Sequence, residues 1–174
     1  ILCCSKGKPH FNRDDVREPY TETYIKGYSD GKRKRPPTKG RFGKTETTYT
    51  VNEKGALPRD VIKMSSLAGG GSERFVYSPS KKDIFTRKEA KSLSLEDQII
   101  HPTQKPIKLT EKLLDACIVD ADSKVVIPFS GTGSEAFVCN ARGLKWVSFD
   151  INQDYVDMGN LLVKKGFPTN GDKK

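Results

Sequence analysis

Hydrophobic positions after residue 100 recur at the spacing of an amphipathic helix. Residues 106–119 read PIKLTEKLLDACIV, in which apolar side chains return every three or four positions. Pro106 suits the first turn of a helix, where an N–H group would have no intrahelical partner. The residues expected on the apolar face are Ile107, Leu109, Leu113, Leu114, Cys117 and Ile118. This pattern predicts a helix that rests on a hydrophobic core.

Two further strand-and-helix pairs are predicted after this helix. The apolar run KVVIPF, residues 124–129, predicts a strand, and SEAFVCNARG predicts a helix that ends at Gly143. KWVSFD, residues 145–150, predicts a second strand, and the next helix has Asn152 as its cap and Gly166 at its end. Strands and helices that alternate with short connections are typical of a parallel sheet. The expected fold class is therefore α/β, of the doubly wound type.

The first hundred residues show no sustained period. Residues 1–5 predict a short strand, and the sequence from there to about residue 98 is polar and rich in turn residues. Only TTYTV, residues 47–51, and RFVYS, residues 74–78, have the composition of strands. A stretch of this length without regular structure is uncommon in a compact domain unless it is functional or disordered. We therefore expect an insert that becomes ordered on a partner.

The positive charge is concentrated in this irregular region. The net charge is +9, and residues 31–44 read GKRKRPPTKGRFGK, without an acidic residue. The basic residues of this run are Lys32, Arg33, Lys34, Arg35, Lys39, Arg41 and Lys44. The run is either a solvated loop or a segment that binds nucleic-acid phosphates, since neutralising phosphates releases counterions. The nearby aromatic residues Tyr20, Tyr24, Tyr28, Phe42 and Tyr49 would either stack on bases or anchor the loop.

The sequence gives no sign of a membrane segment or a metal site. No apolar run approaches about eighteen residues, and no secretory leader is evident, which predicts a soluble, cytoplasmic chain without a membrane partner. The four cysteines and two histidines have no metal-binding spacing, so no metal is expected. The adjacent Cys3 and Cys4 fit a strand in a reducing compartment better than a disulfide. With 174 residues, the chain is about one domain, either a compact unit or part of a larger one.

A candidate ligand site lies between the two predicted strands. Gly131 and Gly133 allow a ligand to approach the backbone closely, and free amides at a helix start attract an anionic group. Asp150 follows Gly131 by nineteen residues and ends the next strand, where a carboxylate can bind ribose hydroxyls. The two features together predict a cofactor that contains adenosine; the alternative is a structural turn and an aspartate that caps the next helix. The third glycine of the dinucleotide fingerprint is absent, which argues against a Rossmann oxidoreductase.

Three motifs give these pieces a more specific resemblance. HPTQKP at residues 101–106, PFSGTGS at 128–134 and FDINQDY at 149–155 resemble the carboxyl-terminal part of the DNA amino-methyltransferases. Enzymes of this family transfer a methyl group from S-adenosylmethionine to adenine N6 or cytosine N4. SKGKPHFNRDDVREPY and NEKGALPRDV resemble the permuted subgroup, in which the cofactor motif comes last. The resemblance implies a Rossmann-like methyltransferase fold, present in part, with double-stranded DNA as the partner.

The resemblance also assigns roles to individual residues. Residues Phe129, Ser130, Gly131, Thr132 and Gly133 would line the methionine end of S-adenosylmethionine, and Asp150 would bind its ribose. Thr103 and Lys105 would offer a hydroxyl and a cation to the carboxylate of S-adenosylmethionine; the alternative for Lys105 is a solvated lysine before a helix. Both X-Pro pairs of HPTQKP favour an extended backbone that holds Lys105 in place. His101 is interpreted as structural, because no partner for acid–base work is evident.

The resemblance implies a division of the chain. Residues 1–19 would belong to the methyltransferase core, 20–98 to a basic target-recognition region, 99–166 to the cofactor-binding half and 167–174 to a polar tail. The recognition region would bind DNA through Lys32, Arg33, Lys34, Arg35, Lys39 and Arg41.

The sequence departs from the family at two places. Ile127 stands where the family usually has an aspartate, a change that could weaken cofactor binding by about 1–3 kcal/mol. The catalytic tetrapeptide, Asp/Asn/Ser-Pro-Pro-Tyr/Phe/Trp, is absent, and RPPT at residues 35–38 does not match it. In the permuted order this motif would precede Ile1. We therefore expect a fragment that is inactive alone and works with a separate catalytic half or as a homodimer.

The expected activity is that of a site-specific DNA methyltransferase that acts on a flipped base. Adenine N6, the commoner target in the family, is the first expectation. The alternatives are a cytosine N4 methyltransferase and a non-catalytic DNA-binding module derived from the family.

Overall fold

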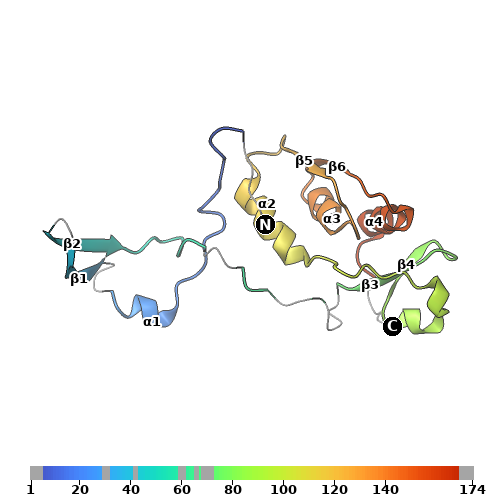
Figure 1. Cartoon of the computed structure of the whole chain (residues 1–174), viewed down its shortest axis with the longest axis horizontal. Coiled ribbons are helices and arrows are strands. Elements are labelled where there is room, and N and C mark those ends of the chain that lie inside the picture. The colour runs from blue at the N-terminus through green and yellow to red at the C-terminus, as the bar shows by residue number, and fades with distance from the viewer. Residues whose placement is uncertain are drawn as a thin grey trace. The chain divides into compact units, whose positions relative to one another are not determined.

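The computed structural model describes residues 6–28, 32–40, 43–58, 62–64, 67 and 73–168 (Figure 1). These residues form two compact units. The smaller unit runs from Phe11 to Ile62, and the larger unit contains the described residues on either side of it. The strand expected at residues 1–5 lies outside the described residues, as do residues 169–174 of the polar tail expected at 167–174. Phe167, at the start of that expected tail, instead packs against Phe75 and Phe137.

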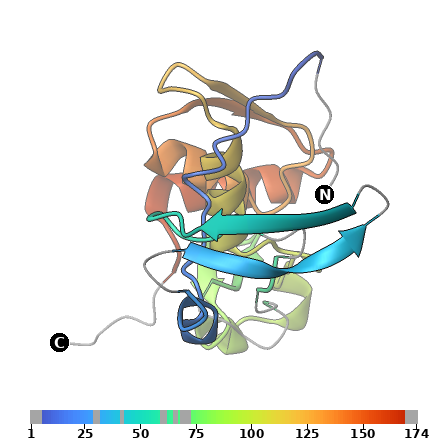
Figure 2. The same cartoon turned by 90° about the vertical axis from the view of Figure 1, so that its left-hand side faces the viewer.

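The smaller unit contains a short helix and a two-stranded hairpin. Helix α1, Glu22–Ile25, begins after Thr21, whose side chain accepts a hydrogen bond from the Tyr24 amide. Strands β1, Lys32–Gly40, and β2, Gly43–Thr50, pair in antiparallel register (Figure 2). The basic run is interpreted from its sequence as either a solvated loop or a phosphate-binding segment. The loop interpretation is wrong for residues 32–40, whose backbone forms strand β1. The run becomes a strand because it pairs with the threonine-rich segment, whose composition favours sheets.

Two prolines are accommodated inside β1 by a bulge. The register shifts between Arg35 and Thr38, so that Pro36 and Pro37 stand opposite the single residue Glu46. Proline lacks the N–H group needed by a regular ladder and is therefore confined to edges and bulges.

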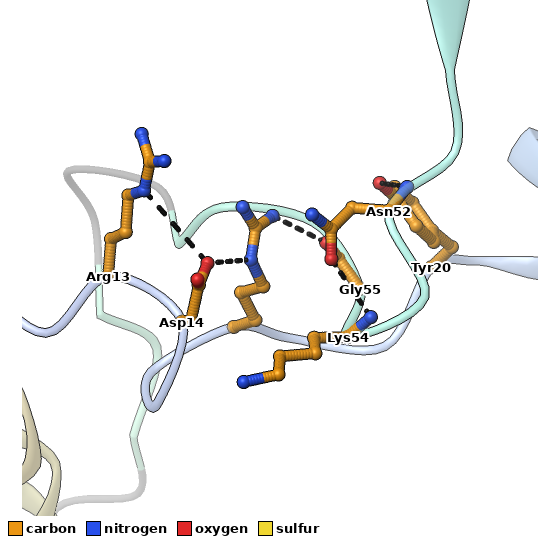
Figure 3. A network of polar contacts seen from close by, with 7 residues as sticks. Arg13, Asp14, Tyr20, Asn52, Lys54 and Gly55 are labelled. Carbon is orange, nitrogen blue, oxygen red and sulfur yellow. Dashed lines mark hydrogen bonds and ion pairs between the residues drawn. The ribbon is translucent and has the colours of Figure 1, made fainter.

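The base of the hairpin joins two segments that are distant in sequence. Arg17 donates hydrogen bonds to Asp14 at 2.6 Å and to the Gly55 carbonyl at 2.7 Å (Figure 3). Glu18 exchanges backbone hydrogen bonds with Ala56. A Cβ added to Gly55 would lie 2.3 Å from the Glu18 carbonyl oxygen, so this contact requires glycine. The segments NRDDVREPY and NEKGALP therefore meet in space, although about 38 residues separate them.

The larger unit begins with an antiparallel pair, β3, Phe75–Ser78, and β4, Asp83–Thr86. Two 3-10 turns follow, η2 at Glu89–Ser92 and η3 at Leu95–Asp97. Phe75, Tyr77 and Ile84 form a buried cluster with residues of helix α4, Gln153–Lys165. The larger unit therefore contains elements on both sides of residue 99, and its described residues from Phe75 to Asp97 include two strands and two 3-10 turns.

The elements expected after residue 100 are all present. They are α2, Ile107–Cys117; β5, Lys124–Ile127; α3, Ser134–Ala141; β6, Lys145–Ser148; and α4. Strands β5 and β6 are parallel, as expected. The Asn152 side chain caps α4 by accepting from the Asp154 amide at 2.9 Å, and Gly166 ends that helix. The expectation for α2 is wrong in one detail, because Cys117 is exposed whereas Thr110 and Ala116 are buried.

Only one face of the β5–β6 pair is covered in the described part of the chain. Ile127 packs with Ala136, Cys139 and Leu144 on the side of the helices (Figure 1). On the other face, Val126 and Val147 stand opposite each other and are 63% and 44% exposed. A doubly wound sheet has helices on both faces. Over the residues that the structure describes, the architecture is therefore mixed α/β with one parallel and two antiparallel pairs, and its doubly wound character is not evident.

Candidate functional site

The glycine loop connects β5 to α3 and is held by its own backbone. Gly131 and Gly133 have φ values of 51° and 77°, in the left-handed region where glycine is favoured. The Gly133 amide donates to the Ser130 carbonyl at 2.9 Å, and Gly133 caps α3. The Thr132 and Ser134 hydroxyls, both buried, lie 3.1 Å apart. The loop is therefore a tight turn that ends directly at the first residue of α3.

Asp150 lies at the end of β6 and is joined to this loop. Its carboxylate accepts hydrogen bonds from the Gly131 amide at 2.8 Å and from the Asn152 amide at 3.0 Å. The Asn152 amide is the main cause of a pKa below the usual value for this carboxyl; burial opposes the shift, and the Gly131 amide adds to it. Asp150 is thus an ionised group that fixes the loop. Since a carboxylate has about four acceptor positions, it can also bind a ligand hydroxyl.

The HPTQKP turn lies against the glycine loop. The His101 ring packs on Tyr155 with ring centroids 4.6 Å apart, and its Nδ1 accepts from the Thr103 amide at 3.2 Å. A Cβ added to Gly131 would lie 2.9 Å from His101 Nε2. Burial is the main cause of a pKa below the usual value for His101, and Lys105 adds to the effect.

Lys105 reaches the first turn of α3. Its Nζ forms an ion pair with Glu135 Oε1 at 2.9 Å, and its side chain is 49% exposed. The turn is fastened at its other end by Glu73. The Glu73 carboxylate accepts from the Ile107 amide at 2.9 Å, and its backbone carbonyl accepts from the Gln104 side chain at 2.6 Å. These contacts place Thr103 and Lys105 on the same side of the larger unit as the glycine loop.

The other residues singled out from the sequence have distinct environments. Ser130 and Thr132 are buried, whereas Phe129 is 82% exposed. Ile127 is only 7% exposed and lies in the core beside α3, so its side chain has an apolar environment here.

One residue of this region is not singled out by the sequence. Gly159, inside α4, contacts the glycine loop, because a Cβ added to Gly133 would lie 2.6 Å from the Gly159 Cα. A glycine inside a helix costs about 1 kcal/mol relative to alanine, and this cost is the signal that could have pointed to a close contact. His101, which is interpreted from the sequence as structural, makes a contact with Gly131 that depends on the tertiary fold.

The hairpin carries most of the candidate DNA-binding residues. Lys32 is exposed, the backbone of Arg33, Lys34, Arg35 and Lys39 lies in β1, and Arg41 lies outside the described residues. Successive strand residues alternate between faces, and the bulge restores the alternation on its far side. The register thus defines an arginine face with Arg33, Arg35, Thr38, Thr45, Thr47 and Tyr49. It also defines a lysine face with Lys32, Lys34, Lys39, Lys44, Glu46, Thr48 and Thr50.

The described part of the chain contains neither a metal-binding cluster nor a helix that could span a membrane. Its histidine, cysteine and acidic residues form no group of three or more that could hold a metal ion. None of its helices is long and apolar enough to cross a membrane.

A glycine loop between a parallel strand and a helix, joined to an acidic residue after the next strand, is typical of α/β proteins that bind nucleotide cofactors. A profile of the DNA methylase family, specific for N6 and N4 methylation, matches residues 1–161. The chain therefore belongs to the DNA methylase family, as the sequence motifs predict.

Characterised members of this family match different lengths of the chain. The type II methyltransferase M1.MboII of Moraxella bovis is 28% identical over 167 residues, which are 95% of this chain and 53% of that enzyme. M.HpaI of Haemophilus parainfluenzae is 40% identical over 67 residues, 38% of this chain and 21% of that enzyme. The DNA adenine methyltransferase YhdJ of Escherichia coli is 37% identical over 59 residues, 34% of this chain and 20% of that enzyme. The chain thus spans about half the length of M1.MboII and a smaller part of the other two.

Proposed function

We propose that this chain is the cofactor-binding and target-recognition part of an S-adenosylmethionine-dependent DNA methyltransferase. It would serve the transfer of a methyl group to an exocyclic base amine, with adenine N6 preferred to cytosine N4 because one of the matched relatives is a DNA adenine methyltransferase. The observation that carries the proposal is the hydrogen bond from Gly131 to Asp150, which builds a nucleotide-type loop in a chain of this family.

The residues around the glycine loop fit S-adenosylmethionine, which supplies the methyl group when bound. Asp150 is ionised and retains acceptor capacity for the ribose hydroxyls. The backbone of residues 129–133 would line the methionine end. Thr103 and Lys105 would bind the carboxylate, with Lys105 exchanging its partly buried partner Glu135 for the ligand.

We further propose that the hairpin of the smaller unit binds double-stranded DNA. The major groove admits a two-stranded ribbon, and arginine is the side chain that most often reads guanine there. The arginine face would read base edges, while Lys32, Lys34 and Lys39 on the lysine face would neutralise flanking phosphates. Arg41 would add to this positive charge.

The catalytic tetrapeptide would come from another part of the protein or from a second chain. Two observations support this arrangement: the motif is absent from the sequence, and in the described part of the chain Val126 and Val147 are exposed on one face of the β5–β6 pair. The remaining strands of a Rossmann-like sheet would pair with the edges of β5 and β6, and the helices that connect those strands would cover this face. Such an arrangement corresponds to the permuted order, with the catalytic motif before the recognition region and the cofactor loop last.

A calorimetric titration with S-adenosylmethionine tests the proposal, followed by a titration with duplex DNA at several salt concentrations. We expect binding of both ligands, no methyl transfer by the chain alone, and transfer when a catalytic part is added. Asp150→Ala should abolish cofactor binding, and its unfolding midpoint must be measured because Asp150 also holds the loop. Salt-dependent DNA binding without S-adenosylmethionine binding would instead support the non-catalytic DNA-binding module.

A further inference from the structure

His101 connects the two segments that would hold the cofactor. Its ring stands between Tyr155 of α4 and Gly131 of the glycine loop, while Thr103 of the HPTQKP turn donates to it. The imidazole is therefore the spacer that sets the distance from the turn to the loop.

The hydrogen bond from Thr103 fixes the tautomer of this ring. Nδ1 accepts the Thr103 amide proton, so Nδ1 must carry a lone pair and the neutral ring carries its proton on Nε2. Nε2 is the ring atom nearest to the point where a Gly131 Cβ would lie, at 2.9 Å. A second proton would go to Nδ1. Nδ1 would then be a donor that faces the Thr103 amide donor, and the hydrogen bond between them would be lost.

We propose that neutral His101 is a positioning residue for the cofactor site, holding the HPTQKP turn and the glycine loop in the arrangement that binds S-adenosylmethionine. This inference rests on the proposed function, since it concerns the same site. It also assigns a role to a residue for which the sequence suggests only a structural one.

The surroundings of the ring favour the neutral form. Burial is the main factor that lowers the pKa of His101, and Lys105 and Arg74 act in the same direction. Asp150 and Glu135 oppose them. Because the pKa of the folded state lies below the ordinary value of 6.5, the folded state binds fewer protons than the unfolded chain just below pH 6.5. His101 therefore stabilises the arrangement above that pH, and this contribution is lost as the pH falls through the lowered pKa.

The test uses the fact that the chain has only two histidines, His10 and His101. His10→Asn leaves His101 as the single imidazole and is the matched control. His101→Asn places an amide oxygen near the position of Nδ1, so the Thr103 amide keeps an acceptor. The variant lacks the rest of the ring and has no group that titrates at this position. Thermal melts of both variants show whether each is folded.

The first readout is S-adenosylmethionine affinity between pH 5 and pH 8. Wild type and His10→Asn should bind with constant affinity near neutral pH and lose about tenfold per pH unit below the pKa of His101, as expected for one linked proton. His101→Asn should bind more weakly at neutral pH, with a flat profile in the acidic range. Identical profiles for wild type and His101→Asn would overturn the inference.

The second readout needs no cofactor. In His10→Asn, nitrogen NMR of the imidazole should show an unprotonated Nδ1 and a protonated Nε2, and the Gly131 amide resonance should shift with the same midpoint as the ring. The opposite tautomer, or a Gly131 resonance that ignores the titration, would overturn the role of His101. If S-adenosylmethionine binds at no pH, the proposed function fails, and the NMR result still decides whether His101 couples the two segments.

Discussion

At the residue scale, the contact between Gly133 and Gly159 is asymmetric. A Cβ on Gly133 would lie 2.6 Å from backbone, at a residue whose φ is 77°, whereas the nearest atom to a Cβ on Gly159 lies 3.4 Å away. At the first distance, the added Cβ would clash with the backbone of α4, which cannot move aside as a flexible side chain could. The second is an ordinary van der Waals contact.

The two alanine variants should consequently change the free energy of unfolding differently. Gly133→Ala should lower the free energy of unfolding by about 2 kcal/mol or more, from left-handed strain and overpacking. Gly159→Ala should be neutral or raise it by up to about 1 kcal/mol, because alanine favours the helix. Urea unfolding of the two variants measures both effects. Equal destabilisation by both substitutions would show that the contact tolerates no side chain from either element.

Lys105 allows a stability role to be separated from a binding role. Its ion pair with Glu135 is half exposed, and exposed pairs contribute only about 0–1 kcal/mol to stability. A charge-assisted hydrogen bond to a ligand carboxylate contributes about 1.5–3 kcal/mol. Lys105→Ala should therefore leave the melting temperature nearly unchanged and weaken S-adenosylmethionine binding by about tenfold or more.

Lys108→Ala is the matched control for this prediction. Lys108 is exposed on α2, three residues further along the chain. Calorimetric titrations of both variants provide the comparison. If the Lys105 and Lys108 variants bind the cofactor equally well, Lys105 has only the role of a solvated lysine.

At the element scale, local patterns predict α2 to α4 well, whereas before residue 100 they predict β3 and the end of β2 but not β1, β4 or the two 3-10 turns. In residues 106–165, the spacing of apolar residues matches the repeat of a helix or a strand, so each element can be predicted from its own segment. The alternation of these elements then predicts the parallel pair. Strand β3 packs against Met158 and Leu162, about 80 residues further along the chain, and these contacts stabilise it. The β1–β2 hairpin is stabilised by pairing between its two strands. Such long-range contacts leave no period in the sequence.

The same distinction explains which parts of the candidate site are predictable. Gly131, Gly133 and Asp150 belong to a motif with fixed spacing along consecutive elements. The contacts of His101 and Gly159 with this loop arise only when the HPTQKP turn and α4 pack against it. Ile127 shows the converse: its position in the motif suggests a site residue, but strand alternation directs it into the core.

The two faces of the hairpin lead to a prediction for DNA binding. Arg33→Lys combined with Arg35→Lys keeps the charge but removes the planar fork that reads guanine. This variant should retain its overall DNA affinity and salt dependence but lose preference for particular sequences. Lys32→Ala and Lys34→Ala should each reduce the slope of log affinity against log salt by about 0.9 and leave the preferred sequence unchanged.

Selection from duplexes with a randomised centre, followed by affinity measurements at several salt concentrations, separates these outcomes. If the arginine double variant enriches the same sequence as wild type, the arginine face does not read bases. If neither the wild type nor any variant binds DNA, the proposed recognition role of the hairpin itself is wrong.

At the scale of the whole molecule, the uncovered face of the β5–β6 pair should determine how the chain associates. An isolated two-stranded sheet is marginally stable in water, and an exposed apolar face favours contact with another surface. Val126 and Val147 are the paired residues at the centre of this face, and Ile127 lies on the opposite, buried face. The chain should therefore self-associate at high concentration unless a catalytic part covers the face.

Threonine substitutions test this prediction, because threonine has nearly the shape of valine and also favours strands. Val126→Thr combined with Val147→Thr should reduce self-association in analytical ultracentrifugation and weaken any complementation by a catalytic part, with little change in unfolding free energy. Ile127→Thr, the control on the buried face, should instead lower the unfolding free energy by about 1–3 kcal/mol. If the double variant unfolds as readily as Ile127→Thr, Val126 and Val147 are packed against the chain itself, and the sheet has no open face for a partner.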